Sequence, residues 1–334
     1  MKIALDAMGG DLAPQAIIQG AFDAISRSSE DLEIILVGNK DKINSCLDKT
    51  LPNQISIHHA SEIVTMDDDG SKIFKSKPNS SIVQGLKLVK ENNANAFISA
   101  GHTGAVMATS LFLLGRIPDV KRPCLGVCIK TQTGGKIICD VGANPDANPE
   151  QLLQFAIMGS IAVQNTENIN TPSIGLLNVG TEELKGNEKS QETSELLKKS
   201  SLNYIGFVEG DDIYKGNVDV IVCDGFEGNI ALKASEGVAK MFSFFIKKSF
   251  TKNIFTKLVA ILASPVMKDF RSKVDPGKYN GASLLGLKGV VVKSHGNADI
   301  DSFFQAIREA YLEAHARITD KISEQLTREL QEHK

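Results

Sequence analysis

The sequence predicts an α/β protein, a three-layer α/β/α sandwich with a mostly parallel sheet. Short β-branched runs alternate with amphipathic stretches along most of the 334 residues, as in repeated βαβ units. Several of these runs are continuously apolar, which is typical of strands covered by helices on both faces. The length allows one large domain or two medium ones. Because no internal repeat or low-complexity linker interrupts the pattern, we predict a single domain over residues 1–334.

The individual elements follow from the same alternation. The predicted strands are Lys2–Asp6, Glu33–Val37, Ala96–Ser99, Leu125–Ile129, Lys136–Asp140, Ser173–Asn178, Val218–Asp224 and Gly289–Lys293. The predicted helices are Pro14–Arg27, Ser80–Glu91, Thr103–Leu114, Pro149–Val163, Glu188–Ser200 and Gly228–Lys248. A strand followed by a helix and a parallel strand is the unit from which such sheets are built.

Composition excludes several classes of protein. The 37 basic residues against 40 acidic ones, with 6% aromatics and no Trp, argue against general nucleic-acid binding. The five scattered cysteines do not suggest a disulfide framework. Asp6 stands where a signal peptide needs its apolar stretch, and no run of about 20 apolar residues exists. These features predict a cytoplasmic location.

Five predicted strands run directly into turns rich in Gly, Asn and Asp. The turns are Asp6–Asp11, Ser99–Gly104, Asp140–Asn144, Asn178–Glu182 with its continuation to Glu188, and Asp224–Asn229. In open α/β sheets, ligands bind outside the carboxyl ends of the strands. Glycine lets the backbone approach a ligand, and the helix that follows presents free N–H groups to an anion. We therefore expect the five turns to meet around one crevice that holds a phosphate-like anion, although such residues also close ordinary tight turns.

Four side chains in these turns are candidates for chemistry. Lys185 is the best-placed cation for neutralising an oxyanion, unless it is an ordinary surface lysine. Asn229 and Asn144 carry amide donors for developing negative charge, yet Asn is also a common helix cap. His102 heads a predicted helix, where it can donate to a phosphate or a carbonyl or else bond to the backbone.

Other familiar sites are missing from the sequence. Gly134-Gly135-Lys136 lacks the earlier glycine and the hydroxyl residue of a nucleotide-binding loop, and no dinucleotide fingerprint occurs. The acidic run Asp67–Gly70 resembles a solvated turn more than a Mg²⁺ site. No spacing suggests a catalytic triad or a cysteine metal site. The residues thus carry no familiar nucleotide-binding motif and no cysteine metal-site spacing.

The segment Lys240–Lys273 is basic and apolar together. It holds eight cations and one acid, Asp269, so it carries a charge of +7 while the rest of the chain carries −10. Ser264-Pro265 divides it into two helices, with the uncharged run Leu258–Met267 at the division. We predict a protruding amphipathic hairpin over 240–273. Such a hairpin suits an anionic bilayer surface, an acidic protein partner or a packed interface, and we favour a surface role.

Taken together, the motifs resemble one known family. Asp6–Asp11, Ser99–Ala105, Asp140–Asn144, Lys185–Glu188, Val208–Gly210, Asp224–Asn229 and Gly281–Leu287 occur in this order. As a set, they closely resemble the bacterial phosphate acyltransferases (PlsX, acyl-acyl-carrier-protein:phosphate acyltransferase) over nearly the whole chain. The chain departs from the family at His102, where Asn is usual, and at Thr181, where an acidic residue is usual.

The resemblance implies a homodimer with a fold like that of phosphotransacetylases and isocitrate dehydrogenases, and it implies neither a metal nor an organic cofactor. It implies that acyl carrier protein thioester and inorganic phosphate become acyl phosphate and free carrier, and that a membrane glycerol-3-phosphate acyltransferase uses the product for phospholipid synthesis. Lys185, Asn229 and His102 are then the catalytic candidates. The predicted phosphate and substrate contacts are Asp6, Met8, Gly9, Gly10, Gly101, Thr103, Gly104, Asn144 and Gly228.

The basic hairpin fits this function. Releasing a long acyl chain into water costs about 0.8 kcal/mol per CH₂, and handing the product over at a membrane surface avoids most of that cost. The predicted contacts with membrane or acyl carrier protein are Leu258, Leu262, Lys257, Lys268 and Arg271, which gives a cytoplasmic protein held peripherally at the membrane. Two alternatives stay open: a phosphotransacetylase acting on short acyl-CoA, and a non-catalytic scaffold that binds membrane or carrier.

Overall fold

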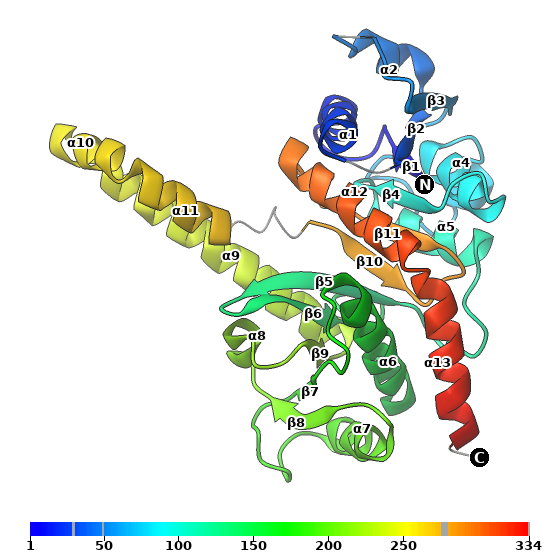
Figure 1. Cartoon of the computed structure of the whole chain (residues 1–334), viewed down its shortest axis with the longest axis vertical. Coiled ribbons are helices and arrows are strands. Elements are labelled where there is room, and N and C mark those ends of the chain that lie inside the picture. Colours follow the sequence, from blue (N-terminus) through cyan, green and yellow to red (C-terminus); the bar gives the residue numbers. More distant parts are fainter. Residues whose placement is uncertain (29–30, 49, 275–279, 333–334) are drawn as a thin grey trace.

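A computed structural model describes residues 1–28, 31–48, 50–274 and 280–332. In this part of the chain, one sheet of eleven strands runs through the molecule in the order β3-β2-β1-β4-β11-β10-β5-β6-β9-β7-β8 (Figure 1). The strands are β1 (Lys2–Asp6), β2 (Glu33–Gly38), β3 (Ile55–His59), β4 (Ala96–Ser99), β5 (Cys124–Thr131), β6 (Gly134–Cys139), β7 (Ile174–Leu177), β8 (Tyr204–Val208), β9 (Val220–Val222), β10 (Ala282–Leu285) and β11 (Val290–Lys293).

Helices cover both faces of this sheet. They are α1 (Gln15–Arg27), α2 (Lys40–Ser45), α3 (Ile73–Ser76), α4 (Ser81–Lys90), α5 (Thr103–Leu113), α6 (Pro149–Thr166), α7 (Glu188–Lys199), α8 (Asp212–Lys215), α9 (Gly225–Phe250), α10 (Ile254–Leu262), α11 (Ser264–Val274), α12 (Ile300–His315) and α13 (Ile318–Glu332). All eight predicted strands and all six predicted helices have counterparts. The α/β sandwich predicted from the sequence is confirmed.

The core consists of two apolar layers, one on each face of the sheet. Along β1, Ile3 and Leu5 belong to one layer and Ala4 to the other, and all three are fully buried. Phe155 of α6 and Phe303 of α12 fill the first layer. This double burial explains why the strand sequences are continuously apolar instead of alternating.

The sheet changes direction near its middle. Seven of the ten strand pairings are parallel, but β10 runs antiparallel to β11 and to β5, and β5 runs antiparallel to β6. The strands β1, β2, β3, β4 and β11 therefore run one way, while β6, β7, β8 and β9 run the other way. A mostly parallel sheet is thus confirmed. The carboxyl ends of these two sets face opposite edges of the sheet, so the five turns of the expected crevice come from both edges.

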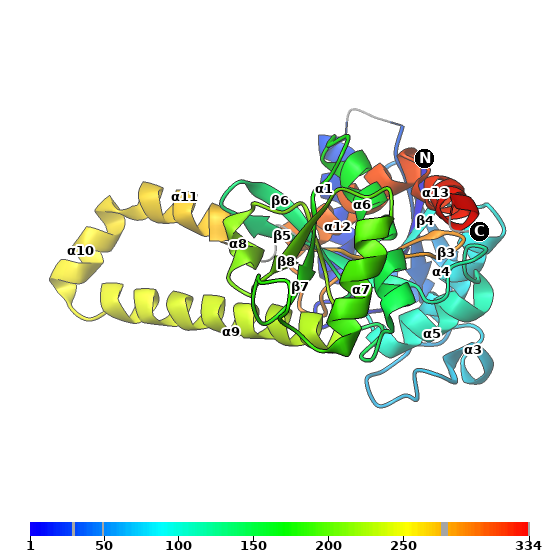
Figure 2. The same ribbon diagram turned by 90° about the horizontal axis from the view of Figure 1, so that it is seen from below.

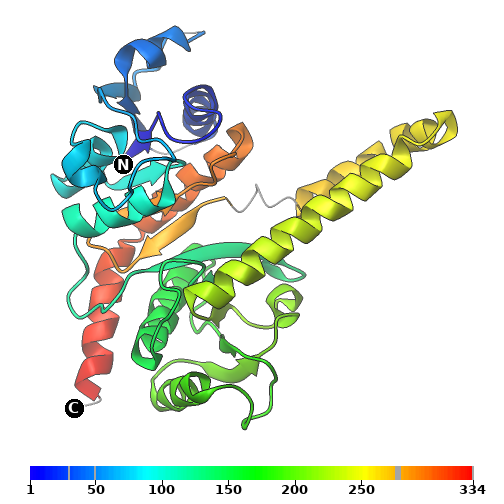
Figure 3. The same cartoon turned by 180° about the vertical axis from the view of Figure 1, so that it is seen from behind.

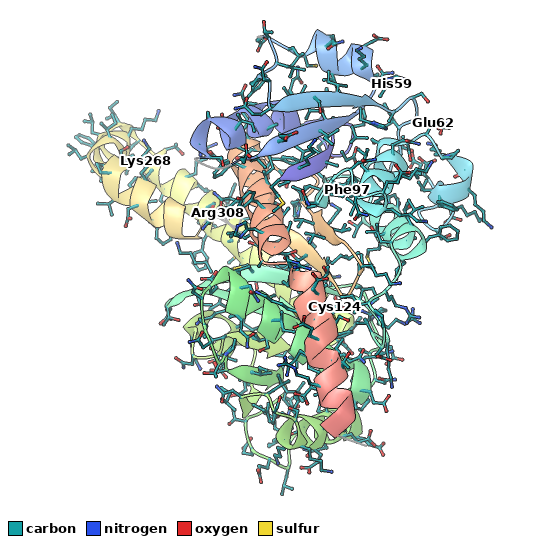
Figure 4. All side chains as sticks on the ribbon, turned by 45° about the vertical axis from the view of Figure 1, so that its right-hand side comes forward. His59, Glu62, Phe97, Cys124, Lys268 and Arg308 are labelled. Carbon is teal, nitrogen blue, oxygen red and sulfur yellow. The ribbon has the colours of Figure 1, made fainter. Side chains whose placement is uncertain are left out.

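Helices α9, α10 and α11 form an arm that extends well beyond the sheet (Figures 1 and 2). With 26 residues, α9 is about 39 Å long at 1.5 Å per residue. Only Gly225 and Gly228, at its start, are buried among the described side chains of this helix. Lys268 of α11 lies on the arm, whereas Phe97 and Cys124 lie in the sheet (Figure 4). The arm begins in a helix that starts at Gly225, fifteen residues before the predicted hairpin.

Candidate functional site

The turns after β1 and β4 touch each other. A Cβ built on Gly9 would lie 2.6 Å from the backbone nitrogen of Gly101, so only glycine allows this approach. The turn after β11 joins them, because the N–H of Asp11 donates to the carbonyl of Gly296 at 2.7 Å. We call residues 6–11, 99–104 and 293–296 the first turn group.

Asp6 holds this group together from inside. Its side chain is 1% exposed, and it accepts hydrogen bonds from the Ser99 hydroxyl at 2.6 Å and from the Met8 N–H at 3.1 Å. The Ser99 hydroxyl in turn accepts from the N–H of Gly101 at 3.0 Å. Burial raises the pKa of Asp6 above its usual range, against the lowering effect of these bonds. Asp6 and the Met8 N–H therefore shape the turns, and the contact of Asp6 and Met8 with a substrate stays a prediction.

Several N–H groups of the first turn group remain available to a ligand. Within the described residues, the N–H groups of Gly9, Gly10, Thr103 and Gly104 have no hydrogen-bond acceptor. Thr103 and Gly104 open α5, and their side of the turn is exposed. A helix start with unpaired N–H groups carries about half a positive charge and favours an anion.

His102 caps the helix that carries these free groups. Its Nδ1 accepts a hydrogen bond from the N–H of Ala105 at 3.2 Å, which is the role of an N-cap residue. With Nδ1 as acceptor, a neutral ring carries its proton on Nε2. The backbone-bonded alternative for His102 is therefore present, and it leaves Nε2 as the only ring atom able to donate elsewhere.

The turns after β6 and β9 behave differently, and we call residues 140–144 and 224–229 the second turn group. The fully buried Asp140 accepts from the N–H groups of Leu125, Gly142, Ala143 and Asn144 at 2.7 to 3.2 Å. These turns therefore satisfy their own donors and offer no cradle for an anion.

Asn144 belongs to this internal network. Its Nδ2 donates to the carbonyl of Pro123 and to Asp140, both at 2.8 Å. Both amide hydrogens are thus engaged within the protein. The structure does not support the prediction that Asn144 donates to developing charge on a substrate.

The start of α9 is locked against the β6 turn. A Cβ built on Gly228 would lie 1.9 Å from the carbonyl oxygen of Asp140, so the helix and the strand end pack backbone to backbone. This contact by itself requires glycine at position 228, and the predicted substrate contact of Gly228 stays a prediction. The packing of the helix on the strand end also fixes the next residue, since Asn229 lies across from Gly142, 3.8 Å from a Cβ built there.

An ion pair joins α7 to the cap of α9. Asp224 accepts from the N–H groups of Phe226 and Glu227 at 3.1 and 2.9 Å, and it pairs with Lys189 of α7. Lys185, four residues before Lys189, is exposed, and its ammonium has no carboxylate within 4 Å in the described part of the chain. The structure places Asn229 beside the β6 turn, and in the part of the chain that it describes no hydrogen bond joins Lys185 to Asn229.

Helix α9 connects the two turn groups. Asn229, Lys233 and Glu236 lie on one face at helical spacing, over about 10 Å of the axis. Asn229 is beside the second group, whereas Glu236 lies 3.7 Å from Nε2 of His295 in the first group, and it accepts from Lys233 at 3.0 Å. The residues of the predicted single crevice thus fall into two turn groups, which Asn229 and Glu236 contact from the two ends of this face of α9. Figure 3 shows α9 from behind, running from the sheet out into the arm.

Sequence reasoning missed three charged residues of this region: Lys189, Lys233 and Lys293. Lys293 could have been found from the sequence, because β11 runs into a glycine-containing turn at residues 293–296. This is the same signal that indicated the other five turns. Lys189 and Lys233 lie on helix faces with no such local signal.

Solved structures with this fold include phosphotransacetylases. A EutD phosphotransacetylase from Staphylococcus aureus is similar with a TM-score of 0.62 and 17% identity over 95% of this chain and 94% of that chain. A phosphotransacetylase from Streptococcus pyogenes is similar with a TM-score of 0.63 and 16% identity over 94% of each chain. The architecture therefore defines a three-layer α/β protein of the phosphotransacetylase fold, as the sequence implied.

Sequence relatives narrow this further. A family model described as "Fatty acid synthesis protein" matches residues 1–320. The chain is 52% identical to a phosphate acyltransferase of Ruthia magnifica over 99% of this chain and 98% of the relative. It is 46% identical to a phosphate acyltransferase of Hydrogenovibrio crunogenus over 100% of this chain and 99% of the relative. It is also 46% identical to a phosphate acyltransferase of Legionella pneumophila over 98% of this chain and 96% of the relative. The chain belongs to the phosphate acyltransferase family, and it is therefore an acyltransferase, as predicted.

Proposed function

We propose that the chain transfers a long acyl group from acyl carrier protein thioester to inorganic phosphate, for phospholipid synthesis. A phosphate oxygen attacks the thioester carbonyl, the C–O bond forms and the C–S bond breaks. The leaving thiolate takes up a proton, so acyl phosphate and free carrier protein result. The observation that carries the proposal is the set of unpaired N–H groups at Gly9, Gly10, Thr103 and Gly104, which suits a phosphate beside a helix start.

The side chains of the two turn groups divide the work. The first group holds phosphate, with His102 able to donate from Nε2. Asn229, fixed across from Gly142, orients the thioester carbonyl and donates to its developing negative charge. Lys185 is the exposed cation that neutralises this charge. Bringing the two reactants together supplies much of the acceleration, so no covalent intermediate is needed.

The test is phosphate-dependent consumption of long-chain acyl carrier thioester, with the product trapped by hydroxylamine as a hydroxamate. Asn229→Ala and Lys185→Ala should each lower the rate at least tenfold, by loss of one charge-assisted hydrogen bond. Lys199→Ala, exposed at the far end of α7, is the matched control and should retain the full rate. An active preparation that forms no hydroxamate rejects the proposal, and turnover of acetyl-CoA alone favours the short-chain alternative.

The arm suggests where the product is delivered. Within the described residues, α10 has no buried side chain, and Leu258 and Leu262 are 54% and 82% exposed. Lys257 and Lys268 are also exposed, while the side chain of Arg271 lies outside the described part. No helix among the described residues is long and apolar enough to cross a bilayer. We therefore propose peripheral contact of α10 and α11 with an anionic membrane, where acyl phosphate passes to a membrane glycerol-3-phosphate acyltransferase.

A second exposed apolar face lies on α9. Val238, Met241, Phe242 and Phe245 recur at helical spacing and are 47 to 57% exposed. A homodimer would cover this face, whereas the tip of the arm would stay free for the membrane. Sedimentation of Phe242→Glu should show dissociation if this holds, and an unchanged dimer would reject the assignment.

Vesicle binding tests the membrane contact. Leu258→Glu with Leu262→Glu should abolish co-sedimentation with anionic vesicles, and binding by the unmodified protein should weaken with added salt. Ile205→Glu, a half-exposed apolar position on β8, should bind as before. Unchanged co-sedimentation of the double variant would exclude the arm as the membrane contact.

A further inference from the structure

Lys293 is a buried cation of the first turn group. It ends β11, in register with Ser99 at the end of β4, and it is 9% exposed. Its ammonium donates to the carbonyl of Ser294. Across the described residues, no carboxylate oxygen lies within 4 Å of it. An ammonium so far out of water is stable only with nearby negative charge.

The charges around Lys293 do not balance it. Asp6 attracts it from beyond ion-pair distance, but the Asp6 carboxyl already accepts from Ser99 and Met8. Lys233 on α9 repels it. Burial, with this repulsion, lowers the pKa of Lys293 to about 8, so the ammonium is still the main form at pH 7. The free protein thus holds a buried positive charge that a bound anion would stabilise.

The backbone around Lys293 is held in place. The N–H of Ser294 donates to the carbonyl of Ser99 at 2.9 Å, and the buried side chain of Asn280 donates to the Ser294 hydroxyl and accepts from the N–H of His295. Gly10, whose N–H is unpaired, lies against this turn, since a Cβ built on it would be 3.0 Å from the carbonyl of Gly296. Lys293 therefore belongs to the same rigid group as the free N–H donors.

We propose that Lys293, with Lys233 facing it from α9, is the cation that holds the inorganic phosphate used as nucleophile. The inference rests on the proposed function. Inorganic phosphate carries up to two negative charges at neutral pH. These charges would stabilise the buried ammonium and offset its repulsion by Lys233. The thioester is uncharged and gains nothing from either lysine. Lys233 itself is paired with Glu236 and half exposed, so its part is the smaller one.

The experiment compares Lys293→Met and Lys233→Met with Lys288→Met, an exposed lysine just before the same strand. For each protein, KM is measured separately for phosphate and for acyl carrier thioester. Phosphate binding is also measured by calorimetry without an acyl donor. Lys293→Met should raise the phosphate KM and the phosphate Kd at least tenfold, and Lys233→Met severalfold, with the KM for the acyl donor within twofold. Lys288→Met should match the unmodified protein.

Two variants separate binding from folding. Without phosphate, the unfolding temperature of Lys293→Met should be no lower than that of the unmodified protein, because burial disfavours the ammonium. Lys293→Arg should recover part of the phosphate affinity that Lys293→Met loses. If Lys293→Met unfolds, Lys233→Met on the exposed helix face decides. An unchanged phosphate KM and Kd in both methionine variants overturns the inference. So does a rise in KM for the acyl carrier alone, which would assign the lysines to the phosphodiester of the carrier's prosthetic arm.

The calorimetry keeps this inference distinct from the proposed function. Failure of the unmodified protein to form hydroxamate rejects the acyl transfer. Loss of phosphate binding in Lys293→Met supports the lysine assignment whether or not acyl transfer occurs, and unchanged phosphate binding overturns it.

Discussion

Replacing Gly228 by Ala tests how the site is built, because it adds one methyl group where α9 meets the end of β6. That methyl would lie 1.9 Å from the carbonyl oxygen of Asp140 and 2.8 Å from Sγ of Cys223. Cβ atoms in proteins essentially never come closer than 3.0 Å, so the two backbones have to separate by about 1.1 Å. Neither can avoid the contact by rotating a side chain, since the nearest atom is backbone.

Two magnitudes follow from that separation. Overpacking costs about 1 to 3 kcal/mol, which lowers Tm by about 1 to 4 °C in a chain of this size. Asn229 moves with the helix start, and a shift of about 1 Å in a positioning group lowers the rate by about 100-fold. Helix propensity acts in the opposite direction by about 1 kcal/mol, and a control on the same helix removes this effect from the comparison.

Gly237→Ala is that control. It lies on the exposed part of α9, and a Cβ built there meets no atom within 4 Å. It should raise stability by about 0.5 to 1 kcal/mol and leave the rate unchanged. The assays are differential scanning calorimetry and hydroxamate formation on both variants. If Gly228→Ala behaves like Gly237→Ala in both assays, α9 is not packed on the β6 turn and our account of Asn229 fails.

Three further expectations concern stability. Lys189→Met leaves the buried Asp224 without its ion pair and should cost about 2 kcal/mol by urea unfolding, whereas no loss would show that Asp224 is satisfied by its caps alone. Burial alone would raise the pKa of Asp219, but hydrogen bonding led by Lys136 lowers it. This contribution is present above about pH 4 and is lost as the pH falls through the folded pKa, so Asp219→Asn should show a smaller loss of stability in acid. Burial raises the pKa of Glu313 to about 8, so its stabilising contribution is complete below about pH 4.5 and lost as the pH rises through 8. At pH 9, Glu313→Gln should therefore have a free energy of unfolding about 2 to 4 kcal/mol higher than the unmodified protein, and a higher urea midpoint. At pH 4 it should be no more stable, and equal midpoints at pH 9 would contradict this.

Part of the site could be predicted from local sequence alone. The turn at residues 6–11 follows an apolar strand and contains two glycines, a pattern that predicted a close approach of the backbone to a ligand, and the structure shows that Gly9 allows a close approach to the backbone of Gly101. The same local signal did not reveal that Asp140 would take up the donors of its own turn, because that depends on where a buried carboxylate points after folding. Turns with similar sequences therefore have opposite roles, one offering N–H groups and the other using them.

The amino-acid sequence by itself determined the elements of this protein, the doubly covered sheet, the family and the charged apolar segment, since each is encoded in residues close together along the chain. Only the tertiary structure decided how these parts meet. The insertion of β10 between β11 and β5, and the β5–β6 hairpin, reverse the sheet and separate the turns into two groups. Helix α9 then connects them through Asn229, Lys233 and Glu236. Strand order and direction arise from pairings between residues distant in the chain, and the physical reason they escape local patterns is that each strand buries its apolar side chains equally well in either direction.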